Sequence, residues 1–85
     1  MTELTSMKNI GKELAAKLNF VGINSAEELI ELGSKQVFLR LKIKCPNVCL
    51  VHLYSLEGAI CGIEFNNLAD DKKKELKVFS DSLKK

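Results

Sequence analysis

Apolar positions recur at helical spacing through most of this chain, between short turn signals. Leu14, Leu18 and Val21 lie three or four residues apart, which predicts an amphipathic helix from Lys12 to about Val21. Gly22 follows directly, and glycine commonly takes the left-handed conformation just after a helix. The first long helix is therefore expected to end at Gly22.

Two short helices are predicted in the middle of the chain. Ser25 followed by Glu28 is the pattern of a capping box, which starts a helix that ends before Gly33. Ser34 is then expected to cap a further helix that runs to about Lys44.

The most apolar segment follows the single proline. Pro46 suits the first turn of a helix, where its missing N–H group would have no partner. The segment from about Asn47 to Cys61 is apolar on nearly all sides, which is typical of a helix at the centre of a bundle. Its β-branched Val48, Val51 and Ile60 leave a buried strand as an alternative, although the segment lacks the period-two alternation of a strand.

An apolar-studded connection over 63–68 leads to the last predicted helix. Asp70 and Asp71 suit its positive N-terminal end, and Lys84 and Lys85 suit its negative C-terminal end. Its buried stripe is formed by Leu76, Phe79 and Leu83.

These elements predict an all-α fold, a compact bundle of five or six short helices with a helix-hairpin-helix-like N-terminal half. The 85 residues suffice for a single domain over 1–85. The composition, with 46% hydrophobic and 28% charged residues, is that of a globular protein and does not indicate disorder.

The lack of a recognisable targeting signal and the pattern of cysteines favour a cytoplasmic protein. The first six residues show no signal peptide, and no segment is apolar enough to span a bilayer. The three cysteines are odd in number and loosely spaced, which indicates reduced thiols.

The charge is unevenly distributed, although the net charge is only +2. Residues 1–33 carry three bases and five acids, residues 34–62 four bases and one acid, and residues 63–85 six bases and five acids. Such runs ordinarily mark a solvated helix face. The bases concentrate in two groups, Lys35, Arg40, Lys42 and Lys44, and Lys72, Lys73, Lys74 and Lys77.

The segment 7–15 resembles a helix-hairpin-helix motif, whose usual form is Gly-apolar-Gly, three residues, then Ala. Ile10, Gly11 and Ala15 match, and Asn9 replaces the first glycine. Ile10 is expected to point inward, Gly11 to allow a tight turn, and the small Ala15 to let two helices approach. Asn9 tolerates the left-handed conformation better than most residues.

The hairpin is a candidate nucleic-acid contact, because exposed N–H groups at a helix N-terminus suit a DNA phosphate. The alternative is a turn used only for folding, and the net negative charge of residues 1–33 favours it. The candidate nucleic-acid-binding residues are Lys8, Asn9, Ile10, Gly11, Lys12 and Glu13 of the hairpin, assisted by Lys35, Arg40 and Lys42.

A longer series of residues resembles the C-terminal domain of the TfoX (Sxy) family of bacterial competence regulators. The resemblance covers about residues 7–76. Its most specific pieces are Leu-Tyr-Ser-Leu-Glu-Gly-Ala at 53–59 and Gly-Ile-Glu-Phe-Asn-Asn-Leu at 62–68. The resemblance implies a helical domain, a role in regulating transcription of DNA-uptake genes together with other transcription factors, and no enzymatic activity. Regulators of this family usually carry an α/β domain ahead of the domain resembled here.

Other chemistries are weakly supported. Cys45, Cys49 and His52, with Cys61 further along, could hold zinc in principle, but their spacing is not that of a zinc finger or ribbon. His52 is the single histidine and has no aspartate nearby in sequence, which argues against general-base catalysis. We therefore expect no enzyme, no metal and no other cofactor.

Several residues leave alternatives open. Glu57 is expected to reach the surface or to pair with a base such as Arg40, and Gly58 to allow a close helix contact. Phe65 and Leu68 are expected either to fold onto the bundle or to form an exposed apolar patch, which would indicate a protein interface.

The sequence thus predicts a non-enzymatic interaction module with two alternative partners. One is DNA, contacted at its phosphates without reading base sequence. The other is a protein, either a transcription factor or a second copy of the chain. Neither a membrane nor a small-molecule substrate is expected.

Overall fold

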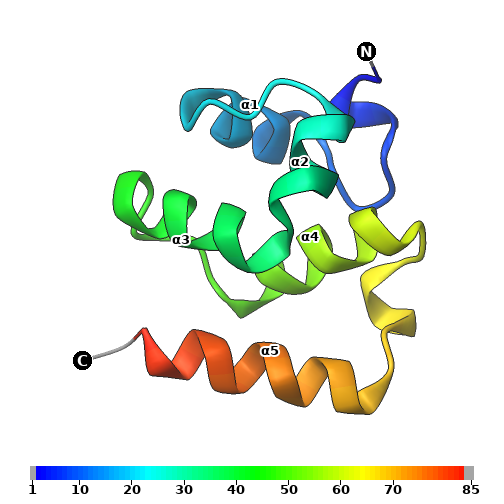
Figure 1. Cartoon of the computed structure of the whole chain (residues 1–85), viewed down its shortest axis with the longest axis vertical. Helices are drawn as coiled ribbons and strands as arrows, with labels where there is room; N and C mark the ends of the chain where they lie inside the picture. The colour runs from blue at the N-terminus through cyan, green and yellow to red at the C-terminus, as the bar shows by residue number, and fades with distance from the viewer. Residues whose placement is uncertain (1, 84–85) are drawn as a thin grey trace.

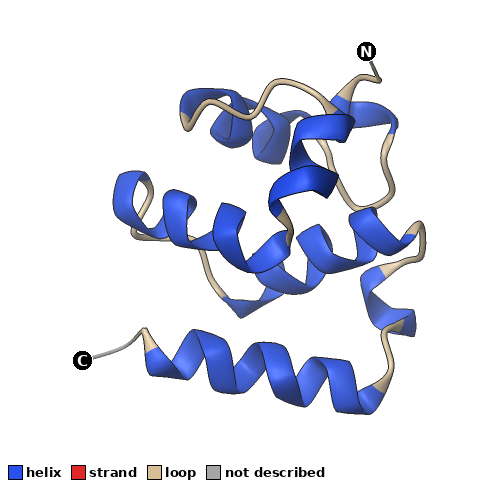
Figure 2. Cartoon of the chain, viewed as in Figure 1, coloured by secondary structure: helices blue, strands red, loops and turns tan. Residues whose placement is uncertain are grey.

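The computed structural model describes residues 2–83, and their regular structure is entirely helical (Figures 1 and 2). This confirms the predicted all-α bundle. In chain order the elements are η1 (Leu4–Ser6), α1 (Lys12–Phe20), α2 (Ala26–Leu32), α3 (Ser34–Lys44), α4 (Leu50–Cys61), η2 (Phe65–Asn67) and α5 (Asp70–Ser82). No helix among the described residues is long and apolar enough to cross a membrane.

The apolar helix α4 lies at the centre of the bundle. α3, α5 and η2 all pack against it, and Figure 1 shows α5 running along one side of the α3–α4 pair. Leu53 and Leu56 of α4 are completely buried. The prediction of a central helix is therefore confirmed, and the alternative of a buried strand is wrong.

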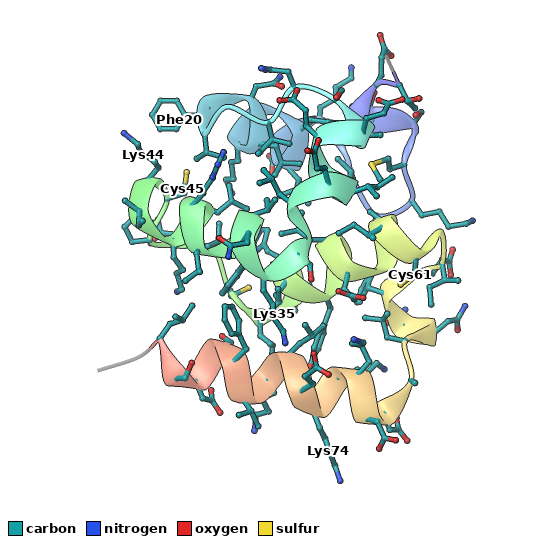
Figure 3. All side chains as sticks on the ribbon, in the orientation of Figure 1. Phe20, Lys35, Lys44, Cys45, Cys61 and Lys74 are labelled. Atoms are coloured by element: carbon teal, nitrogen blue, oxygen red, sulfur yellow. The ribbon has the colours of Figure 1, made fainter. Side chains whose placement is uncertain are left out.

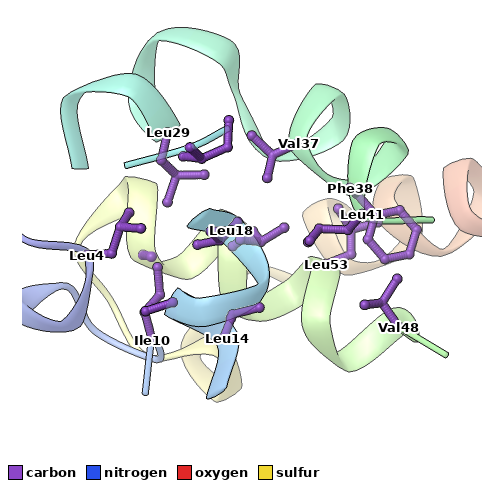
Figure 4. Packing of buried hydrophobic residues seen from close by; sticks show 14 of the residues in the cluster. Leu4, Ile10, Leu14, Leu18, Leu29, Val37, Phe38, Leu41, Val48 and Leu53 are labelled. Carbon is purple, nitrogen blue, oxygen red and sulfur yellow. The ribbon is translucent and has the colours of Figure 1, made fainter. Parts of the chain in front are cut away.

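A single hydrophobic core connects the elements from η1 to α5 (Figure 4). Leu76 is the residue through which α5 enters this core, and Phe79 and Leu83 pack against it while remaining half-buried. The largest fully buried side chains come from five helices and two connections, and include Leu18, Ile23, Leu29, Val37, Phe38, Leu41, Val48, Leu53, Leu56 and Leu76.

The predicted ends of α1 and α2 are confirmed. Gly22 and Gly33 take the left-handed side of φ, at +89° and +86°. At the start of α2, the hydroxyl of Ser25 accepts a hydrogen bond from the N–H group of Glu28 at 3.2 Å. The Glu28 carboxylate in turn accepts one from the N–H group of Asn24 at 3.1 Å.

Ser34 does not cap α3, contrary to the prediction. It is the first residue of that helix, and no side chain caps the helix N-terminus. The buried Ser34 hydroxyl instead donates to Oε1 of Glu57 at 2.6 Å. A charged carboxylate is a stronger acceptor than the neutral groups nearby, which explains this choice. Glu57 is half-buried and is held by Ser34, so it does not pair with Arg40.

Helix α4 begins three residues later than predicted, at Leu50. Pro46 lies in a turn in which the N–H group of Val48 donates to the carbonyl of Cys45 at 3.1 Å. Lys42 donates to the Val48 carbonyl at 2.9 Å. Val48 is buried in the core, so this turn places an apolar side chain inside the bundle before the helix starts.

The last helix opens on Asp70 and Asp71 as predicted. Lys84 and Lys85, which were expected to close it, lie outside the described residues.

Candidate nucleic-acid interface

The turn before α1 has the conformation that the helix-hairpin-helix pattern predicts at two of its positions. Asn9 is left-handed, with φ at +70°, and Ile10 is buried in the core. The prediction that Gly11 is needed for a tight turn is wrong. Its φ of −91° and ψ of −176° are extended backbone, which any residue can adopt. A Cβ atom on Gly11 would meet no atom within 4 Å, so this position is open to solvent.

Asn9 holds the turn against the C-terminal end of α4. Its side-chain Nδ2 donates to the carbonyl of Ile63 at 2.9 Å and lies 3.5 Å from that of Ser55. Its Oδ1 accepts from the N–H group of Phe65 at 3.2 Å. Figure 1 shows the loop before α1 beside the end of α4. The amide of Asn9 is therefore used within the fold and positions the turn rather than a ligand.

Gly58 of α4 lies directly beneath this amide. A Cβ atom on Gly58 would lie 2.5 Å from Nδ2 of Asn9 and 2.8 Å from the carbonyl oxygen of Ile63. The predicted close approach at Gly58 therefore exists, but it is made by the hairpin turn and by the chain after α4 rather than by a second helix.

The N-terminal end of α1 is uncapped and faces solvent. Gly11 has no side chain with which to cap the helix, and no group within residues 2–83 accepts a hydrogen bond from the N–H groups of Gly11, Lys12 or Glu13. Lys8 and Lys12 are exposed beside this end and form no ion pair with another described residue. A helix N-terminus flanked by two cations can hold a phosphate, although Glu13 lies in the same turn.

The other predicted cations lie elsewhere. Lys35 donates to Oε2 of Glu75 on α5 at 2.6 Å, and this hydrogen-bonded cation lowers the pKa of Glu75. Lys42 binds the carbonyls of Pro46 and Val48. Arg40 lies beside Phe20, which is at the opposite end of α1 from Gly11. Lys12 is thus the first residue of α1 and Lys8 is exposed four residues earlier, whereas Lys35, Arg40 and Lys42 do not join them at this helix end.

An apolar hollow of about 320 Å³ escaped the sequence analysis. It is lined by Phe20, Val21, Arg40, Ile43 and Lys44, and Figure 3 shows Phe20 and Lys44 at the same end of the molecule. Phe20 is 67% exposed and Ile43 is 78% exposed. Both residues fall outside the buried stripe of their own helix. A large apolar residue at such a position is the sequence signal that could have indicated an exposed apolar surface here.

The patch anticipated at Phe65 and Leu68 does not form. Leu68 is buried, and the half-buried Phe65 packs against the core, so both residues fold onto the bundle.

The cysteines do not gather. Cys45 follows α3, Cys49 precedes α4 and Cys61 ends it. Within residues 2–83, no three His, Cys, Asp or Glu side chains are placed to hold a metal ion. His52 accepts from the N–H group of Cys49 through Nδ1 at 3.1 Å, and partial burial lowers the pKa of His52.

Comparisons with known proteins agree with this architecture. The model of the TfoX C-terminal domain matches residues 1–80. Protein Sxy of Escherichia coli (strain K12) is 38% identical over 80 residues, which are 94% of this chain and 38% of Sxy, so the chain spans about two fifths of that relative.

Two solved structures are also similar. An uncharacterized protein from Listeria monocytogenes, in a triclinic form, has 44% identity and a TM-score of 0.95, over 96% of this chain and 93% of that chain. A protein of unknown function from Listeria monocytogenes, in a tetragonal form, has 44% identity and a TM-score of 0.93, over 95% of this chain and all of that chain.

Proposed function

Because the chain belongs to the TfoX C-terminal domain family, we propose that it is a non-enzymatic binding module of gene regulation that contacts DNA phosphates through the N-terminal end of α1. The observation that carries this proposal is the uncapped, solvent-facing first turn of α1, which begins at Lys12, with the exposed Lys8 four residues earlier in the chain. Such a role places the protein in the cytoplasm, where bacterial DNA is found.

The hairpin is suited to this contact because its turn is already held in place. Asn9 is tied to the end of α4 and Ile10 is buried, so little conformational entropy is lost when the helix end meets a phosphate. A backbone contact of this kind carries no sequence information. With about two phosphates neutralised, log K should fall with log salt concentration at a slope of about −2.

The first test is a fluorescence-anisotropy titration of a labelled random duplex at low and near-physiological salt. We expect saturable binding that weakens with salt and is lost in Lys12→Glu. Lys74→Glu is the matched control, because Lys74 is exposed on the outer side of α5, far from the hairpin (Figure 3). No binding at low salt, or equal losses in the two variants, would contradict the proposal.

Gly11→Asp separates a binding defect from misfolding. The extended backbone at Gly11 suits an N-cap, and there is space for a side chain. An aspartate there should stabilise α1 by about 0.3 kcal/mol, because glycine is itself a fair N-cap residue, while its carboxylate accepts from the N–H groups and repels phosphate. We therefore expect the melting temperature to rise and DNA binding to fall. A variant that is more stable and binds DNA as well as wild type would contradict the proposed site.

A second candidate function is protein recognition without direct DNA contact. The observation that favours it is the exposure of Phe20 and Ile43 around one hollow. Binding through an apolar surface would survive moderate salt, whereas phosphate contacts would not. The salt dependence of binding therefore separates the two functions.

A further inference from the structure

The hollow between the C-terminal ends of α1 and α3 combines apolar walls with a basic rim. Phe20 and Ile43 are the largely exposed apolar residues of its lining, and Arg40 and Lys44 are the charged residues that line it. All charged residues of α3 are basic. Neither Arg40 nor Lys44 forms an ion pair in the part of the chain that the structure describes. An occupant that offers an apolar side chain beside a carboxylate would satisfy both features.

Helix α2 of the same chain presents that combination. All of its charged residues are acidic, and Ile30 is 53% exposed. Glu27 is occupied by the N–H and hydroxyl groups of Thr2, both at 2.9 Å, and Glu28 is occupied at the helix cap. Glu31 is exposed next to Ile30 and has no ion pair among residues 2–83. Ile30 and Glu31 are therefore the complement of the hollow.

These two surfaces do not meet within one molecule. α2 and α3 are consecutive helices that pack on each other, yet no ion pair joins them in the described chain. Ile30 and Ile43 both remain largely exposed. The two surfaces are complementary in charge and in apolar character, but they are separate within one molecule. The hollow of one molecule can therefore bind Ile30 and Glu31 of another.

We propose that the occupant of the hollow is a second copy of this chain, with Ile30 of one copy seated between Phe20 and Ile43 of the other and Glu31 facing Arg40 and Lys44. This inference rests on the second candidate function and identifies its partner. Five residues line the hollow, whereas a stable interface involves about 20 to 30 residues a side, so the association is weak and depends on concentration. Depending on whether the contact closes on itself, it yields a symmetric pair or longer assemblies.

The experiment is sedimentation equilibrium of the whole chain over a range of concentrations up to about millimolar, where a weak contact of this kind is populated. We expect the average molar mass to rise well above the 9.5 kDa of one chain as concentration increases. High salt should reduce the association only in part, because the apolar contact is not screened. A chain that remains monomeric throughout would overturn the proposal.

A charge exchange identifies the surfaces. Arg40→Glu with Lys44→Glu should abolish association, because both surfaces are then acidic, and Glu31→Lys should weaken it. A mixture of the two variants should form heteromers, since the acidic hollow of one then meets the lysine introduced at position 31 of the other. Lys74→Glu with Lys77→Glu is the matched control of equal charge change, and both residues are exposed on α5.

Circular dichroism checks that each variant remains helical. Association that survives both surface variants, or that is lost equally in the α5 control, would overturn the proposal. The result is independent of DNA: if association fails while duplex binding still requires Lys12, only this inference falls. If the reverse holds, the DNA contact falls and the self-contact stands.

Discussion

The side-chain amide of Asn9 lies against the Cα atom of Gly58, 49 positions later in the chain, where any other residue would place its Cβ. This contact joins the hairpin before α1 to the central helix. From the same position, Asn9 bonds the carbonyl of Ile63 and the N–H group of Phe65, so one side chain closes the end of α4 and fixes the turn.

Gly58→Ala should destabilise the protein although alanine is the better helix former by about 1 kcal/mol. The new Cβ atom would collide with Asn9 and with the backbone at Ile63, and the backbone cannot move without breaking the bonds of Asn9. We expect a net loss of about 2 kcal/mol in the free energy of unfolding, measured by urea denaturation.

Gly11→Ala is the matched control for that substitution. A Cβ atom at Gly11 meets nothing, and its backbone is extended, so its stability should stay within about 0.5 kcal/mol of wild type. Equal effects at the two glycines would show that the contact between Asn9 and Gly58 is unimportant.

Asn9→Ala should cost about 3 kcal/mol. Two hydrogen bonds are lost, at about 1 kcal/mol each, and alanine is strained by about 1 kcal/mol in the left-handed conformation. Asn9→Gly also removes the hydrogen bonds, but glycine adopts a positive φ without strain. It should therefore lower the free energy of unfolding less than Asn9→Ala does. Denaturation curves in which alanine and glycine are equivalent would contradict this account of the turn.

Ser34→Ala should lower the free energy of unfolding by about 1.5 kcal/mol, because the buried hydroxyl donates to a carboxylate. The check is a double-mutant cycle with Glu57→Gln. If Ser34 acts through Glu57, the two substitutions will be non-additive by more than about 0.5 kcal/mol. Additive effects would indicate that Ser34 acts through the helix end instead.

The stability should depend on pH through His52. Burial, and next the nearby Lys17, lower the pKa of His52 in the folded chain, so the unfolded chain binds the proton more readily. This contribution is fully present above the unfolded pKa of about 6.5 and is lost as the pH falls toward the lower folded pKa. Nδ1 also accepts from Cys49, a role that protonation removes.

Melting temperatures measured between pH 5.5 and 7.5 test this prediction. They should fall toward the acid end in wild type and change less in His52→Gln. The carboxylates of Glu27 and Glu75 also have lowered pKa values, from hydrogen bonds with Thr2 and Lys35 respectively, but they titrate at more acid pH. Parallel profiles for wild type and His52→Gln would exclude His52 as the source.

The helices were predictable from the sequence because their determinants are local. The cap formed by Ser25 and Glu28 joins residues three positions apart, and the glycines at 22 and 33 act at their own positions. The apolar character of α4 was enough to place it at the centre. Each of these signals is contained within a single element of the chain or its ends.

What the sequence could not supply were partners that are distant along the chain. Ser34 appeared to be a cap because Glu57, its actual partner, is 23 residues away. Pro46 favoured an early start for α4, whereas the burial of Val48 and the bonds from Lys42 delay it. The sequence indicates special roles for Asn9 and Gly58 separately, but no pattern near either residue predicts that the two are in contact. The hollow at Phe20 and Ile43 likewise forms only when two helix ends meet.

The central claim is that DNA meets the N-terminal end of α1, and backbone amide chemical shifts test it most directly. In a titration of ¹⁵N-labelled protein with a random duplex at low salt, we expect the largest shift changes at the amides of Gly11, Lys12 and Glu13, with smaller changes at Lys8. They should vanish in Gly11→Asp. Changes centred instead on the lysines of α5 or on Arg40, or no changes at all, would contradict the claim.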